Sequence, residues 1–310
     1  MTYSPLLRRS IRIVSAISLA FVAVNILQSP AGFAARNGLE SQIRDLIKAS
    51  GAESVSVAYH DLATGTELLI DGDVSFHAAS TMKVPVMLEV FNEAHDGRLS
   101  LDSRITIKNS FSSLVDGSPF TLSPDDDSDK TLYARVGQSA SVRELLHLMI
   151  TVSSNLATNI LIERVTAPRV MTLVKQLGAS RIRVLRGVED SKAFQQGLNN
   201  TTTAGDLMIL LQAIAELKAV SQTASEEMLK IMLDQAFNEG IPSKLPPGVK
   251  VAHKTGSITR SYHDAAIVLP ARTKPYILVV LTRGLEDEAR AHRLVADISA
   301  AVYQSRDRGN

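Results

Sequence analysis

The sequence predicts an α+β fold, in which an antiparallel sheet of N- and C-terminal strands is flanked by helices and carries an inserted all-helical subdomain. Three observations favour it. Residues 54–71 alternate apolar and polar side chains around a turn, residues 141–217 follow helical periods, and residues 249–282 return to strand periods before a final amphipathic helix. Strands from both ends of the chain are therefore expected to meet in one sheet.

The first 34 residues predict a signal peptide, followed by a catalytic domain over residues 35–310. Three arginines stand within residues 8–12, Ile13–Val24 carries no charge, and small residues favour cleavage after Ala31 or Ala34. A retained membrane anchor is the alternative, although the apolar run is short for a membrane span. We therefore expect a periplasmic or secreted protein with no stable membrane span after processing.

The composition excludes several classes of protein. The 310 residues include no cysteine, which excludes disulfides, thiol catalysis and cysteine-containing zinc sites. The formal net charge of +1 includes three arginines of the predicted signal peptide, which has no acidic residue, so the mature chain would carry −2. This balance gives no sign of nucleic-acid binding. A content of 45% hydrophobic residues is that of an ordinary globular protein.

The first elements are a hairpin, a helix and a long loop. Residues 54–71, SVSVAYHDLATGTELLID, predict two strands joined at DLATGT. A helix is expected to begin near Ser80, because Pro85 lacks an N–H group and is tolerated only near a helix start. Residues 112–138 are rich in Gly, Pro, Ser and Asp and predict a loop. We expect its acidic run, Asp125–Asp129, to be solvated surface, with calcium binding as an alternative.

Four helices, three strands and a last helix complete the prediction. Ser141 with Glu144, and Thr203 with Asp206, stand at capping-box positions. The α/β part would comprise residues 35–95 and 225–310, and the helical part residues 96–224. The helices cover residues 141–150, 154–165, 203–217 and 225–237, the strands residues 249–256, 264–270 and 274–282, and the last helix has an apolar face of Ala291, Leu294, Val295, Ile298 and Val302.

Three short motifs carry the chemistry. STMK, Ser80–Lys83, places a hydroxyl and an amine about one helical turn apart, as a nucleophile and its base would be. SSN, Ser153–Asn155, stands between two predicted helices, and KTG, Lys254–Gly256, ends a predicted strand. S-x-x-K, S-D-N and K-T-G are the signature set of class A β-lactamases and penicillin-binding proteins. The mature chain therefore resembles the serine β-lactamase and penicillin-binding protein superfamily, and within it class A.

The resemblance implies a role for each residue that matches a motif. Ser80 would be the acylated nucleophile, Lys83 would take or relay its proton, and Ser153 would pass a proton to the departing lactam nitrogen. Asn155 would hydrogen-bond the substrate's amide side chain. Because a free lysine has a pKa of about 10.4, Lys83 can act as a base only if burial or a neighbouring cation lowers that pKa. Lys254 is a candidate for the cation.

The K-T-G strand is expected to lie along the substrate. Lys254 and Thr255 would bind the carboxylate common to β-lactams, and Gly256, which lacks a Cβ, would let the substrate approach the backbone. The N–H groups of Ser80 and Ser257 would form the oxyanion hole. The alternatives are a solvated lysine in KTG and helix-capping serines in SSN.

Two features depart from the class A pattern. Ser154 stands where class A enzymes usually have aspartate, and the omega-loop motif E-x-x-L-N, which carries the deacylating carboxylate, is absent. Glu189 lies twelve residues before Thr201, close to the expected distance, and is our leading candidate for that base, with Asp190 next. A plain solvated turn stays open as an alternative, because Leu198–Asn199 comes six residues late.

These residues predict an exported serine hydrolase that opens β-lactam rings through an acyl-enzyme on Ser80. We expect a monomer that uses no cofactor and no metal, binds no nucleic acid, and acts on a small β-lactam or a peptidoglycan-like substrate. One alternative is a D-alanyl-D-alanine peptidase or related peptidoglycan enzyme, which would need no omega-loop carboxylate. Another is a secreted binding protein of the same fold that has lost turnover.

Overall fold

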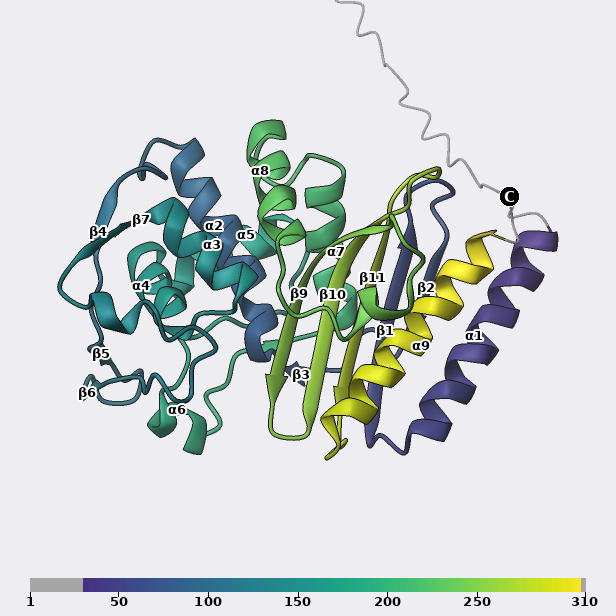
Figure 1. Cartoon of the computed structure of the whole chain (residues 1–310), viewed down its shortest axis with the longest axis horizontal. Coiled ribbons are helices and arrows are strands. Elements are labelled where there is room, and N and C mark those ends of the chain that lie inside the picture. Colours follow the sequence, from purple (N-terminus) through teal and green to yellow (C-terminus); the bar gives the residue numbers. More distant parts are fainter. Residues whose placement is uncertain (1–29, 308–310) are drawn as a thin grey trace, which may run out of the picture.

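A five-stranded antiparallel sheet forms the centre of the molecule (Figure 1). This computed structural model describes residues 30–307, with side chains described from residue 37 to residue 306. The strand order β2-β1-β11-β10-β9 joins the N-terminal hairpin to the C-terminal strands, as predicted, and leaves β9 at an edge. The strands are β1 (Ser54–Asp61), β2 (Glu67–Ile70), β9 (Lys250–Ile258), β10 (Ser261–Leu269) and β11 (Tyr276–Arg283).

Two long helices, α1 (Pro30–Ser50) and α9 (Glu288–Asp307), lie side by side on one face of the sheet (Figure 1). The five apolar residues predicted for one face of the last helix are all buried there. The helix α1 was not predicted, and its start overlaps the predicted signal peptide. Residues 1–29 of that peptide lie outside the described part of the chain. Within residues 30–307 no helix is long and apolar enough to cross a membrane.

The opposite face of the sheet packs against α7 (Ala204–Ala215) and α8 (Gln222–Leu233). A single apolar core joins this face to all of the remaining helices except the short α6, and together these helices form the left side of Figure 1. Burial of this core, at about 25 cal/mol per Å² of apolar surface, is the main force that holds the helices to the sheet. The remaining helices are α2 (Lys83–His95), α3 (Val142–Thr151), α4 (Asn155–Val165), α5 (Ala167–Gln176) and α6 (Ser191–Gln195).

Side-chain caps fix the helix starts that the sequence predicts. Ser141 Oγ accepts a hydrogen bond from the N–H of Glu144, and Thr203 Oγ1 accepts one from the N–H of Asp206, both at 3.1 Å. Each such cap contributes about 1 kcal/mol. The helix α5 was not predicted, although Pro168 in its first turn is a helix-start signal.

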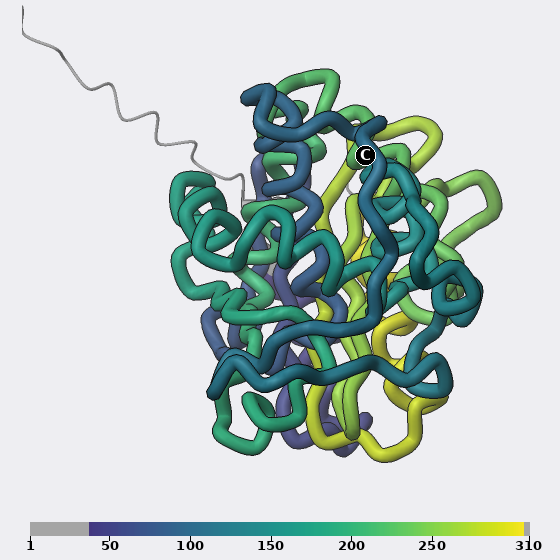
Figure 2. Tube along the Cα trace, turned by 90° about the vertical axis from the view of Figure 1, so that its left-hand side faces the viewer, coloured from purple at the N-terminus to yellow at the C-terminus, as the bar shows by residue number. Residues whose placement is uncertain are grey.

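Short elements bring the loop after α5 beside the start of α2. β3 (Phe76–His77) pairs with β8 (Thr201–Thr202), so the segment before Ser80 lies against the segment that follows Glu189. Figure 2 looks onto the helical side, where the long connection between α2 and α3 crosses the surface in dark teal. The other short elements are β4 (Arg104–Thr106), β5 (Phe111–Ser112), β6 (Pro119–Phe120), β7 (Ser139–Ser141), and the 3-10 turns η1 (Ala79–Met82), η2 (Tyr133–Arg135) and η3 (Ile241–Lys244).

Candidate active site

The STMK motif forms the junction of η1 and α2. The single 3-10 turn ends at Met82 and the α-helix continues from Lys83, with Pro85 in its first turn as predicted. Ala79 has a φ of +46°, a left-handed conformation that is costly for a residue other than glycine. Ser80 is half-buried and lines a cavity of about 530 Å³, whereas Lys83 is fully buried. A hydroxyl at the cavity is thus followed, one turn later, by an amine removed from solvent.

The Lys83 amine contacts three oxygen atoms of the SSN motif. Its Nζ lies 2.6 Å from Ser153 O, 3.0 Å from Ser153 Oγ and 2.8 Å from Asn155 Oδ1. Burial lowers the pKa of Lys83 to about 7, although the carboxylates of Asp127 and Glu189 act to raise it. Burial, rather than the positive charge of Lys254, therefore lowers the pKa of Lys83 enough for its neutral amine to be populated near pH 7.

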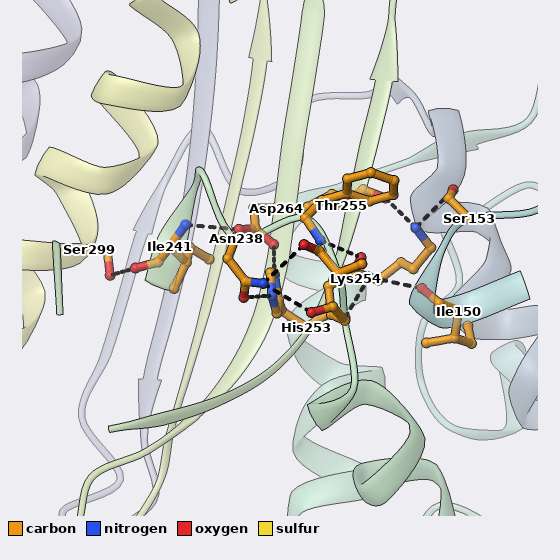
Figure 3. Close-up of polar contacts among 12 residues, drawn as sticks. Ile150, Ser153, Asn238, Ile241, His253, Lys254, Thr255, Asp264 and Ser299 are labelled. Carbon is orange, nitrogen blue, oxygen red and sulfur yellow. Dashed lines mark hydrogen bonds and ion pairs between the residues drawn. The ribbon is translucent and has the colours of Figure 1, made fainter. Parts of the chain in front are cut away.

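A second buried lysine meets the same serine. Lys254 Nζ donates to Ser153 Oγ at 3.1 Å and to Thr255 O at 2.9 Å, and the lysine is fully buried, so the solvated alternative is wrong (Figure 3). Burial, followed by the charge of Lys83, lowers the pKa of Lys254 well below its ordinary value, while Asp264 acts in the opposite direction. Ser153 itself has a φ of +59° at the junction of α3 and α4. One hydroxyl thus bridges the two amines.

The capping alternative holds for only one serine of SSN. Ser154 is the N-cap residue of α4, and its Oγ accepts a hydrogen bond from the N–H of Ala157 at 3.3 Å. Ser153 turns its hydroxyl toward the two lysines instead. The junction therefore separates a structural serine from one that faces the cavity.

The prediction of a solvated acidic run is wrong at Asp127 and Asp129, which are both buried. The Asp127 carboxylate accepts hydrogen bonds from the N–H groups of Asn155 and Leu156 at 2.9–3.0 Å and from the Tyr133 hydroxyl at 2.9 Å. An acidic side chain at a helix N-terminus satisfies free N–H groups and the helix dipole together. Asp127 therefore holds the SSN turn from outside the motif.

The K-T-G strand is the edge strand β9, and it packs directly against η1. A Cβ on Gly256 would lie 3.0 Å from Ser80 N and 3.0 Å from Thr81 N. The glycine therefore allows the strand to approach the turn that carries Ser80, and its predicted role in the approach of the substrate stays a prediction. Thr255 and Ser257 line the same cavity as Ser80.

Glu189 lines the same cavity as the K-T-G strand. Asn155 Nδ2 donates to Glu189 Oε1 at 3.4 Å, and Asn155 Oδ1 accepts from Lys83 Nζ. The Glu189 carboxylate and the Lys83 amine therefore contact the same asparagine side chain. Burial and the nearby charge of Asp126 raise the pKa of Glu189, and Lys83 and Arg186 partly offset the rise. A carboxylate with a raised pKa is better matched to general-base work near neutral pH than an ordinary one.

The carboxylate of Asp190 accepts hydrogen bonds from donors in the surrounding loops and helix. It accepts from Ser113 Oγ, from the N–H of Leu114 and from the N–H of Ala193, at 2.8–3.1 Å. Burial alone would raise the pKa of Asp190, but these donors outweigh burial and the pKa is lowered. Asp190 is thus a helix cap and a loop anchor, and this geometry favours Glu189 as the base.

Two asparagines that the sequence analysis did not select hold the loop of Glu189. Asn159 Oδ1 accepts from the N–H of Val188 at 2.7 Å, and Asn159 Nδ2 donates to Val188 O at 3.0 Å. Asn200 bonds the backbone of Leu185 and Arg186 in the same way. The position of Asn159 four residues after Asn155, one turn further along the same helix, was the available signal.

Comparisons with known proteins agree with the motifs. Residues 37–305 match the family model described as the β-lactamase enzyme family. A β-lactamase from Sphaerobacter thermophilus is 25% identical, with a TM-score of 0.73 over 87% of this chain and 96% of that one. A β-lactamase from Chitinophaga pinensis is 25% identical, with a TM-score of 0.75 over 88% and 100%.

A third similar structure is that of PBP-A. Its leucine-to-glutamate mutant, solved as an acyl-enzyme complex with penicillin G, is 26% identical, with a TM-score of 0.76 over 88% of this chain and 97% of that one. The three matches confirm the predicted α+β fold and the predicted superfamily.

Proposed function

Since the chain belongs to the β-lactamase enzyme family and has the serine β-lactamase-like fold, we propose that it opens β-lactam rings through an acyl-enzyme on Ser80. The observation that carries the proposal is the convergence of Lys83 and Lys254 on Ser153 Oγ, in the wall of the cavity that Ser80 lines. Two amines on one hydroxyl form a path for a proton between the nucleophile and a leaving nitrogen.

In the first half of the reaction the Ser80 hydroxyl gives its proton to the neutral Lys83 amine, and its Oγ bonds to the lactam carbonyl carbon. The backbone N–H groups of Ser80 and Ser257 would stabilise the oxyanion. When the carbon–nitrogen bond breaks, the nitrogen takes the proton of the Ser153 hydroxyl, which is restored from Lys83. Lys254 and Thr255 would bind the substrate carboxylate, and Asn155 its amide side chain.

In the second half a water molecule hydrolyses the ester on Ser80. Its proton would pass to the Glu189 carboxylate, whose raised pKa and position beside Asn155 support this assignment, and would return to the Ser80 oxygen when the ester bond breaks. A peptidoglycan peptidase would not need this carboxylate, so the presence of Glu189 at the cavity favours the lactamase. We further propose that the protein is exported, with residues 1–34 removed.

A stopped-flow burst with a chromogenic cephalosporin tests the proposal. We expect Glu189→Gln to acylate as fast as the wild type and to show a burst followed by a steady phase slowed by about 10²–10⁴-fold, because acylation does not use this base whereas deacylation does. Asp190→Asn is the matched control for a neighbouring carboxylate. Accumulation in the Asp190 variant alone would move the base by one residue, and equal steady turnover in all three proteins would remove this loop from the mechanism. A wild type with neither a burst nor steady turnover would indicate the binding-protein alternative.

A further inference from the structure

A buried polar cluster lies behind the strand that carries Lys254. Successive residues of a strand face opposite sides, so His253 points away from the face that holds the Lys254 side chain. Its Nδ1 lies 2.9 Å from Asp264 Oδ1, and both side chains are buried, with exposures of 0% and 2% (Figure 3). Asp264 pairs with Thr255 across β10 and β9, only one register position from Lys254.

The hydrogen bonds around His253 determine its charge. Asn238 Nδ2 donates to two backbone carbonyls, Gln235 O and Ala236 O, both at 3.1 Å, which fixes the orientation of the Asn238 amide. Its Oδ1 therefore faces His253 Nε2, at 3.3 Å. Asp264 Oδ2 accepts the N–H of Ile241 at 2.9 Å, and Asp264 Oδ1 faces His253 Nδ1. Both ring nitrogens thus meet acceptors, and only an imidazolium can donate to both.

We propose that His253 and Asp264 form a buried imidazolium–carboxylate pair that positions Lys254 and balances the charge around it. The pair deepens the proposed function, because it supports the lysine assigned there to the substrate carboxylate. It also fastens the segment 235–241 to β9, and Phe237 and Glu239 of that segment line the cavity. His253 and Asp264 are therefore positioning residues.

The charges near Lys254 are few enough to give the pair a distinct effect. From α2, Lys83 acts to lower the pKa of Lys254, and from β10, Asp264 acts to raise it. His263, on the Lys254 side of β10, is neutral at pH 7 because burial lowers its pKa to about 4. The segment 235–241 contributes the uncharged amide of Gln235, which donates to His253 O, and the carboxylate of Glu239, which is exposed to solvent. The carboxylates of Asp127 and Glu189 face Lys83 rather than Lys254.

The pair predicts opposite shifts in two variants. Asp264→Asn removes the negative charge, so the pKa of Lys254 should fall. His253→Gln removes the positive charge and leaves Asp264 unopposed, so the pKa of Lys254 should rise. In the double variant the pKa of Lys254 should return close to the wild-type value, because two uncharged amides replace an ion pair whose net charge is zero. A residue that only packs would not move the two single variants in opposite directions.

Nuclear magnetic resonance of protein labelled at lysine ¹³Cε measures these shifts without substrate. The Lys254 signal is assigned by its loss in Lys254→Arg, and its midpoint is followed with pH in the wild type and the three variants. Ser299→Ala is the matched control, because it removes a buried hydrogen bond to Ile241 O on the same segment without changing charge. We expect the titration midpoint of Lys254 to shift in opposite directions in the two single variants and to stay unchanged in the control. Equal Lys254 midpoints in the wild type and the folded single variants would overturn the inference.

Histidine ¹⁵N spectra of the wild type keep the inference testable should a single variant fail to fold. We expect both nitrogens of His253 to be protonated at pH 7, and one unprotonated nitrogen would overturn the pair. The pH profile of Ser80 acylation by a chromogenic cephalosporin then connects the pair to the reaction: its alkaline limb should move to lower pH in Asp264→Asn. If the wild type shows no acylation while the lysine shifts occur, the proposed function fails and the pair stands.

Discussion

Replacing Asp127 with alanine should destabilise the protein far more than replacing its neighbour Asp125. The substitution removes the acceptor of two helix N–H groups, those of Asn155 and Leu156. A lost N-cap costs about 0.5–2 kcal/mol and a buried donor without an acceptor costs about 1–3 kcal/mol. Water entering the vacated space recovers part of this, so we expect a loss of about 2–4 kcal/mol, or roughly 5–10 °C in Tm.

Asp127→Asn adds a second readout of the same contact. The Asp127 carboxylate acts to raise the pKa of Lys83, so the neutral amide should lower that pKa further. Because Lys83 acts as a base only when it is unprotonated, the acid limb of the acylation rate should move to lower pH.

Thermal unfolding and acylation pH profiles measure the two effects. Asp125, whose side chain is 86% exposed and pairs with Lys130, provides the matched controls Asp125→Ala and Asp125→Asn. These controls should stay within about 0.5 kcal/mol of the wild type. A stability loss as small as that of Asp125→Ala, together with an unmoved acid limb, would refute the role given to Asp127.

Three other outcomes follow from the site. Lys83→Ala should slow acylation by several orders of magnitude. In the wild type the acylation rate should fall as pH decreases through about 7, where Lys83 becomes protonated. A rate that stays constant from pH 8 to pH 5 would contradict the role of Lys83 as the base. Gly256→Ala should slow acylation by about tenfold or more, because the new Cβ would displace the backbone of Ser80 and Thr81, and unchanged kinetics would show that β9 can move freely. Intact-mass analysis of exported protein should show a chain that begins after Ala31 or Ala34, and retention of residues 1–34 would favour a membrane anchor instead.

Local patterns predicted the fold well, because strand alternation, capping residues and the position of Pro85 act over a few residues. Ser141 and Thr203 cap their helices as expected, and the apolar face of α9 is buried. The same patterns assigned Ser80, Lys83, Ser153 and Lys254 to the right parts of the fold, since STMK and SSN lie at element boundaries. KTG lies inside β9, which continues to Ile258, two residues beyond the predicted strand end.

The environment of the side chains could not be predicted in the same way. Asp127 looks solvated in a run of acidic residues, and its burial depends on α4, which lies 28 residues further along the chain. The glycine of KTG is needed because η1 approaches β9, a contact between distant segments. His253 and Asp264 become partners only when β9 and β10 pair in register. Long-range contacts, rather than local propensity, decide each of these cases.

The central claim is tested most directly by intact mass spectrometry of the protein mixed with penicillin G and quenched at successive times. We predict an adduct of one penicilloyl group, which forms quickly, disappears quickly in the wild type and persists in Glu189→Gln, and which digestion of the quenched protein locates on the peptide that contains Ser80. Ser80→Ala, with a near-native fold, should form no adduct. An adduct that persists in the wild type would indicate a peptidase-like enzyme, and an adduct formed at full rate in Ser80→Ala would contradict the account, because another nucleophile would then carry the reaction.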